Sequence, residues 1–213
     1  MNPPRVVAVD TETTRLNEPT APTDPNTVWE IAAVTELPSH GLQQWCWQLR
    51  VDPADLDPQA AHVNGFHTRY LLNRPEHAGT AVLVTAAPDG YPPPGSTRTL
   101  QQWAAEFTAL LAGNLWVGIG PDFDTAHLRP LLTRAAQHVT RADHPWHYQI
   151  IDARAMAAGL LGAPAPWHTD TLMRTLNIRP PAHHRHTALG DATAAHRLYT
   201  AVLAERRLQA ARP

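Results

Sequence analysis

The sequence lacks lysine entirely, has a single cysteine and contains no long hydrophobic run. All 17 basic residues are arginines, which excludes a Schiff-base lysine and the lysine of a nucleotide-binding P-loop. The lone Cys46 excludes an internal disulfide and a cysteine-based zinc site. No stretch approaches the roughly 18 apolar residues of a membrane span, and no apolar signal segment follows the N-terminal residues. We therefore expect a cytoplasmic protein without membrane contact.

The composition is that of a folded globular protein. Of the 213 residues, 43% are hydrophobic and 17% are charged, which excludes a disordered chain and suits one domain spanning residues 1–213. The formal net charge of −2 argues against a protein that coats nucleic acid through bulk positive charge. Residues 76–98 are rich in proline and glycine and predict a surface insertion within that domain, in which 81–84 is a candidate short strand.

Hydrophobic patterning predicts an α/β fold. Strands are expected over 5–10, 28–34 and 44–51, with turn residues between them that favour antiparallel pairing. Two further strands, 115–119 and 148–152, alternate with helices, which favours parallel pairing. The prediction is a mixed five-stranded sheet, three antiparallel strands and then parallel ones, flanked by helices near 99–112, 123–137, 153–160, 168–177 and 189–208.

Two carboxylates close the first buried strand. Asp10 and Glu12 are two residues apart, so their side chains share one face of the strand while Thr11 points to the other. Such a pair repels and raises its own pKa values unless a cation lies between the two groups. Hard oxygen ligands at this spacing suit magnesium or manganese. The alternative is a turn in which Asp10 caps the loop backbone.

A third carboxylate, Asp191, lies on the otherwise apolar stripe of the last helix, which it shares with Ala195, Leu198 and Val202. A carboxylate on a core-facing stripe is costly unless it is paired or binds a metal, and a buried salt bridge to an arginine is the alternative. His186 precedes Asp191 by five residues and has the side chain best suited to proton transfer near neutral pH.

A fourth carboxylate follows the strand at 115–119. Asp122 and Asp124 flank Phe123, and Asp124 is the one followed directly by a helical apolar pattern. Asp124 is therefore a candidate site residue, with a plain helix N-cap as the alternative.

Together these residues resemble the DEDDh family of 3′–5′ exonucleases, the DnaQ-like group of proofreading subunits. Asp10–Thr14 resembles the first motif of the family, 118–124 the second and 186–192 the third. The segments 28–34 and 63–67 are similar to the strand and the short hydrophobic-x-Gly segment that lie between the first two motifs. The resemblance covers nearly the whole chain and implies a ribonuclease H-like fold. The chain departs from the family at Arg15, where glycine is usual, and at 119–121, which replace a His-Asn-Ala pattern.

The resemblance also implies roles for individual residues. Two divalent ions, Mg²⁺ or Mn²⁺, would be bound by Asp10, Glu12, Asp124 and Asp191, and His186 would be the general base. Thr13 resembles the position whose backbone contacts the terminal nucleotide. The candidate substrate-binding residues are Thr11, Thr13, Leu16, Phe66 and His67.

The function that these features predict is a metal-dependent exonuclease. It would shorten single-stranded nucleic acid from the 3′ end and release nucleoside 5′-monophosphates by a two-metal mechanism, with DNA favoured. The first alternative is an RNA-trimming, oligoribonuclease-like enzyme, since only a contact to the 2′-hydroxyl separates the two sugars. The second is a non-catalytic nucleic-acid-binding module of the same fold. A polymerase or another nuclease as partner is left open by the sequence.

Overall fold

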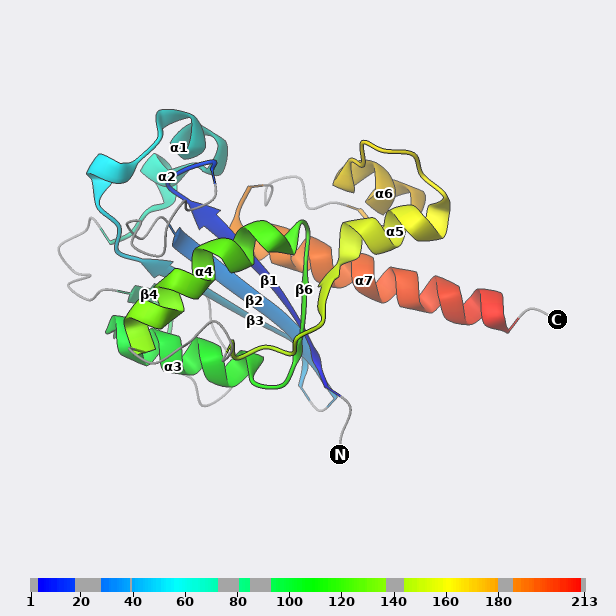
Figure 1. Cartoon of the computed structure of the whole chain (residues 1–213), viewed down its shortest axis with the longest axis horizontal. Coiled ribbons are helices and arrows are strands. Elements are labelled where there is room, and N and C mark those ends of the chain that lie inside the picture. The colour runs from blue at the N-terminus through cyan, green and yellow to red at the C-terminus, as the bar shows by residue number, and fades with distance from the viewer. Residues whose placement is uncertain are drawn as a thin grey trace.

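The computed structural model describes residues 4–17, 28–38, 40–72, 81–84, 93–136, 144–179 and 186–211. They form a mixed open sheet flanked by helices, with strand order β5-β4-β3-β2-β1-β6-β7 (Figure 1). Strand β1 (Val6–Thr13) lies inside the sheet, which agrees with the continuous apolar run of its first half, Val6–Val9. The α/β class with a mixed, helix-flanked sheet is therefore confirmed.

The pairing changes from antiparallel to parallel at β1. Strand β1 pairs antiparallel with β2 (Val28–Leu37), which pairs antiparallel with β3 (Gly41–Leu49). On its other side, β1 pairs parallel with β6 (Leu115–Gly118), followed by β7 (Ile150–Asp152), also parallel. Because these strands are parallel, the C-terminal ends of β1, β6 and β7 point toward the same edge of the sheet, and β1 extends beyond the end of β6.

The predicted number of five strands is wrong, because the described residues alone form a sheet of seven strands. Strands β4 (Ala81–Leu83) and β5 (Thr97–Arg98) extend the sheet beyond β3. All three residues of β4 are fully buried. Residues 81–84 were expected as a short strand within a surface insertion, outside the sheet, and β5 was not expected. Strands of three and two residues are too short to show a periodic pattern between prolines and glycines. Residues 73–80 and 85–92 lie outside the described part of the chain.

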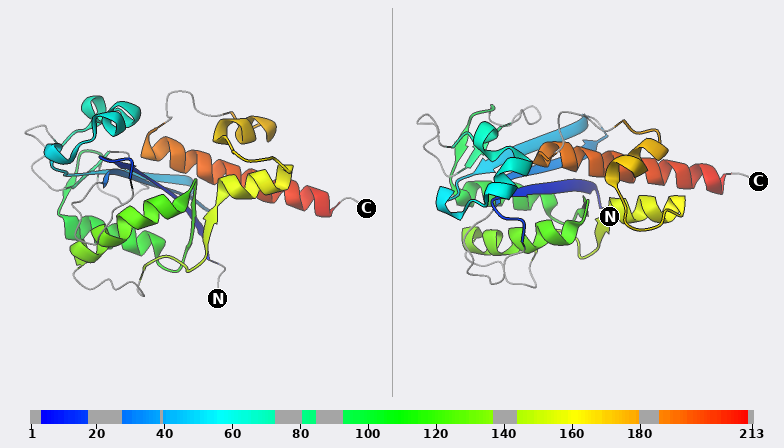
Figure 2. Two further views of the ribbon diagram at one scale, coloured as in Figure 1. Left: turned by 45° about the horizontal axis from the view of Figure 1, so that its top comes forward. Right: turned by 90° about the horizontal axis from the view of Figure 1, so that it is seen from above.

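Helices cover both faces of the sheet (Figure 2). Helices α3 (Leu100–Leu111) and α4 (Pro121–Ala136) pack on one face, where Trp103, Phe107 and Trp116 belong to the core. Thr99 starts α3 with a reciprocal capping box to Gln102. Helices α5 (Ala153–Leu161), α6 (Thr169–Thr175) and α7 (Ala188–Ala210) belong to the other face.

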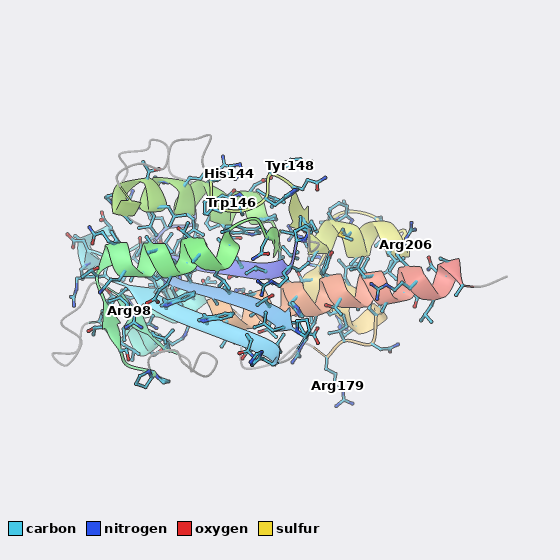
Figure 3. The ribbon with its side chains drawn as sticks, turned by 90° about the horizontal axis from the view of Figure 1, so that it is seen from below. Arg98, His144, Trp146, Tyr148, Arg179 and Arg206 are labelled. Atoms are coloured by element: carbon cyan, nitrogen blue, oxygen red, sulfur yellow. The ribbon has the colours of Figure 1, made fainter. Side chains whose placement is uncertain are left out.

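The core on the α7 face is rich in small residues. Ala8 and Ala32 on the sheet meet Ala192 and Ala195 on α7, and all four are at most 1% exposed. Small side chains let the backbone of α7 approach β1 and β2 closely. The C-terminal part of α7, marked by Arg206, projects beyond the sheet (Figure 3). Among the described residues, no helix has the length and apolar character to cross a membrane.

A short helical segment lies beyond the C-terminal end of β1. It consists of the 3-10 helix η1 (Pro53–Asp55), α1 (Pro58–Asn64) and α2 (Phe66–Arg69). Gly65 joins α1 to α2 with a φ of +66°, a conformation that side chains disfavour. Phe66 anchors the segment, because its ring stacks on Tyr70 and meets the edge of Trp29 in β2. This anchoring fixes Arg69 at the end of α2.

Candidate active site

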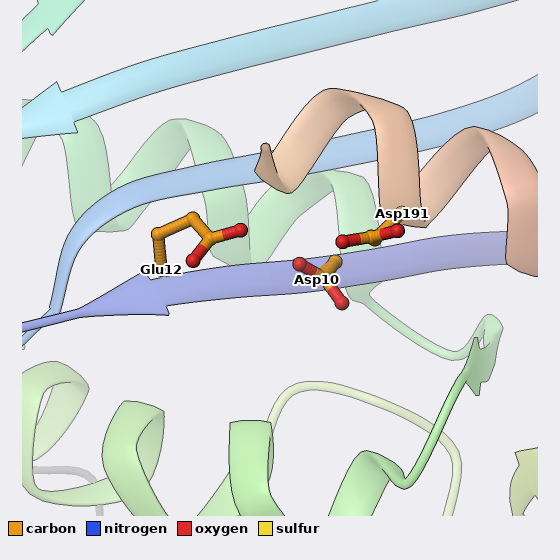
Figure 4. Close-up of side chains that lie close together, drawn as sticks. All are labelled: Asp10, Glu12 and Asp191. Atoms are coloured by element: carbon orange, nitrogen blue, oxygen red, sulfur yellow. The ribbon is translucent and has the colours of Figure 1, made fainter. Parts of the chain in front are cut away.

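Three carboxylates from two elements meet at the end of β1. Asp10 and Glu12 project from β1 toward the first turn of α7, which carries Asp191 (Figure 4). One carboxylate oxygen from each lies within 4.8 Å of the others. All three side chains are partly buried. Three oxygen donors at this separation could hold a divalent metal ion, and the all-oxygen set favours a hard cation.

The start of α7 sets the position of Asp191. Thr187 is the N-cap, and its hydroxyl accepts a hydrogen bond from the Gly190 N–H at 3.0 Å. Asp191 lies one turn inside the helix and accepts a hydrogen bond from the His186 N–H at 3.2 Å. The helix N-terminus also favours a negative side chain in its first turn.

Burial and mutual repulsion hold protons on the cluster. Burial raises the pKa of Asp10 well above its ordinary value of 3.8, and the neighbouring Asp124 and Asp191 raise it further. Burial, followed by Glu30 and Asp191, raises the pKa of Glu12 from 4.5 to about 8, although Arg69 opposes this increase. Divalent cations would remove this repulsion, so binding would release protons.

Asp124 lies beside this cluster and outside the three-carboxylate group. It belongs to the first turn of α4, which begins at Pro121, so Asp124 is inside the helix and the start predicted at 123 is two residues late. Its Oδ1 accepts hydrogen bonds from the backbone N–H and the hydroxyl of Thr11, at 3.0 and 2.7 Å. Burial raises the pKa of Asp124 to about 7, although the Thr11 bonds act to lower it. Asp122, in contrast, is exposed.

His186 lies at the entrance to α7. Its side chain is exposed, and its backbone has a φ of +55°, in the left-handed region that residues other than glycine rarely adopt. Such a conformation persists only when surrounding contacts hold it. The bond from the His186 N–H to Asp191 is one of these contacts. The candidate base is therefore tied through its backbone to a candidate metal ligand.

The predicted substrate-binding residues fall into two groups. Leu16, which is 46% exposed, and His67 lie on the surface. Thr11, Thr13 and Phe66 are buried. Thr11 binds Asp124, the Thr13 hydroxyl donates to the Arg15 carbonyl, and the Phe66 ring packs on Trp29. The side chains available to a nucleotide are thus Leu16 and His67.

Arg15, which departs from the family pattern, is engaged by a neighbour. Its guanidinium forms an ion pair with Asp55 of η1 at 3.0 Å and remains 43% exposed. The pair ties the loop after β1 to the short helical segment.

Sequence reasoning missed two residues beside the cluster, Glu30 and Arg69. Glu30 is 3% exposed and forms an ion pair with Arg69 of α2. It lies opposite Glu12 in the β1–β2 pairing. The available signal was a carboxylate inside the apolar run 28–34, since a buried glutamate requires a partner. Its arginine partner is 39 residues away in the chain, and no local pattern identifies it.

Comparison of the chain with models of known protein families found no match, and comparison with curated proteins found none either.

Proposed function

We propose that this protein is a metal-dependent 3′–5′ exonuclease of the DEDDh type with a ribonuclease H-like fold. The observation that carries the proposal is the partly buried group of Asp10, Glu12 and Asp191, which come from β1 and α7 and each place one carboxylate oxygen within 4.8 Å of the others. Two further features support it: a fourth carboxylate, Asp124, lies beside the group, and the exposed His186 directly precedes Thr187, the N-cap of α7.

The donor set fits two divalent ions, Mg²⁺ or Mn²⁺. Asp10, Glu12 and Asp191 would hold them, with Asp124 supporting the second ion. When bound, the ions would supply an activated water and charge stabilisation for the departing 3′-oxygen. Four acidic groups in a partly buried site, three of them with raised pKa values, favour cations strongly over an empty state.

His186 acts as the general base. In its neutral form it accepts a proton from the water that attacks the terminal phosphodiester. The bond from phosphorus to the 3′-oxygen of the penultimate nucleotide breaks, and the terminal nucleotide leaves as a nucleoside 5′-monophosphate. An exposed imidazole suits this task, because it can pass the proton to solvent after each cycle.

The substrate is a single-stranded 3′ end. Leu16 and His67 are exposed on the elements next to the cluster, where they can pack against terminal bases. The net charge of −2 suits a protein that grips a chain end through bound ions rather than along its length. We favour DNA as substrate, with RNA trimming as the alternative.

The test is an oligonucleotide assay with matched variants. Asp10→Asn and His186→Ala should lower the rate of shortening in Mg²⁺ by at least about 10²-fold, as expected for loss of a metal ligand or a general base. Asp122→Asn removes an exposed carboxylate from the same turn as Asp124 and should leave the rate unchanged. Equal rates for wild type and Asp10→Asn would refute the proposal, and metal binding without cleavage would favour a non-catalytic module. Matched DNA and RNA substrates decide the sugar.

A further inference from the structure

Arg69 connects three segments of the candidate site. Its guanidinium forms an ion pair with Glu30 of β2 and donates a hydrogen bond to the His186 carbonyl oxygen at 3.1 Å. It also donates to the Asn64 carbonyl oxygen at the end of α1. The guanidinium carbon lies 5.0 Å from the centre of the Trp29 ring, within the range of a cation–π contact. One side chain therefore spans α1, α2, β2 and the entrance to α7.

Glu30 extends this connection into α7. Its Oε2 accepts a hydrogen bond from the Ala188 N–H at 3.0 Å, and its Oε1 accepts one from the Gln48 side chain at 3.3 Å. The Gln48 amide also donates to the Arg69 carbonyl oxygen at 3.0 Å. Both carboxylate oxygens and the Arg69 backbone are thus held in place. Together, Arg69 and Glu30 contact the chain on both sides of Thr187: Arg69 at His186, and Glu30 at Ala188.

These contacts bear on the strained residue of the site. His186 has a φ of +55°, its N–H binds Asp191, and its carbonyl oxygen accepts from Arg69. The two peptide groups flanking His186 are therefore fixed from opposite sides, one by a candidate metal ligand and one by Arg69. Asn64, whose carbonyl oxygen accepts a hydrogen bond from Arg69, donates through its side-chain amide to the Thr13 carbonyl oxygen at 2.9 Å. Asn64 thereby links Arg69 to the end of β1.

We propose that Arg69, held by Glu30, is a positioning residue that fixes His186 in the conformation from which it acts as general base. The inference rests on the proposed function. Arg69 contacts the His186 backbone and no reacting atom, so its effect on the reaction passes through His186. A misplacement of about 1 Å can lower a rate by about 10²-fold, so loosening this peptide would affect turnover more than substrate binding.

Arg69→Lys separates positioning from charge. Lysine keeps the positive charge beside Glu30 but lacks the planar fork with which Arg69 reaches both Glu30 and His186. If Arg69 only neutralises the negative charge of the acidic cluster, Arg69→Lys keeps the activity of the wild type. If it positions His186, Arg69→Lys lowers kcat by roughly 10²-fold and changes KM by less than about threefold. The matched control is Arg98→Lys, which alters the Arg98–Glu106 ion pair at the β5 edge and should change neither constant (Figure 3).

A double-mutant cycle with His186→Ala tests the route of the effect. With the base absent, Arg69→Lys should lower the residual kcat by less than about threefold, because the two substitutions act through one group. An equal loss in both backgrounds, or full activity of Arg69→Lys, would overturn the inference while leaving the exonuclease proposal intact. Absence of metal-dependent shortening by the wild type would overturn both.

Hydrogen exchange provides a readout independent of activity. In Arg69→Lys, the Ala188 N–H should exchange about tenfold faster or more, because its acceptor Glu30 is less firmly held. Amides of the β1–β2 ladder should keep their wild-type rates. An unchanged rate at Ala188 contradicts the positioning role, and a uniform increase across the ladder shows loss of global stability instead.

Discussion

Glu12→Gln should stabilise the metal-free protein at neutral pH. The substitution keeps the shape of the side chain and removes its charge. Burial, Glu30 and Asp191 raise the pKa of Glu12 from 4.5 to about 8. The carboxyl group of Glu12 therefore binds its proton more tightly in the folded state than in the unfolded state. The stability linked to Glu12 is fully present below pH 4.5 and is lost as the pH rises to 8.

The size of the effect follows from the same interval. From pH 4.5 to pH 7, at about 1.4 kcal/mol per pH unit, the wild type loses on the order of 3 kcal/mol that Glu12→Gln retains. For a chain of this length, 1 kcal/mol corresponds to about 2–4 °C in Tm. In chelator, we expect Glu12→Gln to unfold roughly 6–12 °C above the wild type at pH 7, and within about 3 °C of it at pH 5.

Metal should reduce or reverse this advantage. The wild type gains about 2.7 kcal/mol at a free Mg²⁺ concentration one hundred times Kd, whereas Glu12→Gln has lost a ligand and gains less. The assay is thermal unfolding by circular dichroism at both pH values, in chelator and in Mg²⁺. Glu205→Gln, on the part of α7 that projects beyond the sheet, is the control and should behave as the wild type. A lower Tm for Glu12→Gln in chelator at pH 7, or a difference independent of pH, would refute the reasoning.

Three further predictions concern the surroundings of the site and the core. Thr11→Val should lower the free energy of unfolding by about 1.5–3 kcal/mol in a urea titration at pH 8, because it removes a hydrogen bond to the buried carboxylate of Asp124. Burial lowers the pKa of His127 to about 4, so the stability contributed by this one side chain is lost as the pH falls from 6.5 toward 4. Relative to the wild type, His127→Gln should therefore become more stable in urea titrations over that interval, and a difference independent of pH would contradict the assignment. Phe107→Ala should cost about 3–5 kcal/mol, measured by the same titration, because this fully buried ring stacks on Trp103.

The sequence predicted those parts of the fold and site that depend on local patterns. The period of two placed Asp10 and Glu12 on one face of β1, and the helical period placed Asp191 on the stripe of α7 that faces them. The helix predicted near 99–112 is confirmed as α3, which Thr99 caps. The change from antiparallel to parallel pairing followed from the order of strands and helices along the chain.

Features that depend on contacts distant in the chain were missed. The candidate strand at 81–84 was not placed in the sheet and β5 was not predicted, because β4 is held by pairing with β3 and β5 by pairing with β4, and their own residues are too few to carry a periodic signal. The Arg69–Glu30 pair and its bond to the His186 carbonyl oxygen join residues 39 and 117 positions apart. Asp124 was recognised as a candidate, but its bonds to Thr11 arise only from the packing of α4 on β1.

The central claim is cleavage from the 3′ end, and the most direct measurement follows a label placed at each end of a single-stranded oligonucleotide. With Mg²⁺ present, a 3′ label should be released in the first cleavage step as a nucleoside 5′-monophosphate. A 5′ label should remain on a series of oligonucleotides that shorten by one nucleotide at a time. Chelator should stop both processes. Release of the 5′ label first, internal cuts before terminal ones, or shortening that continues in chelator would contradict the account.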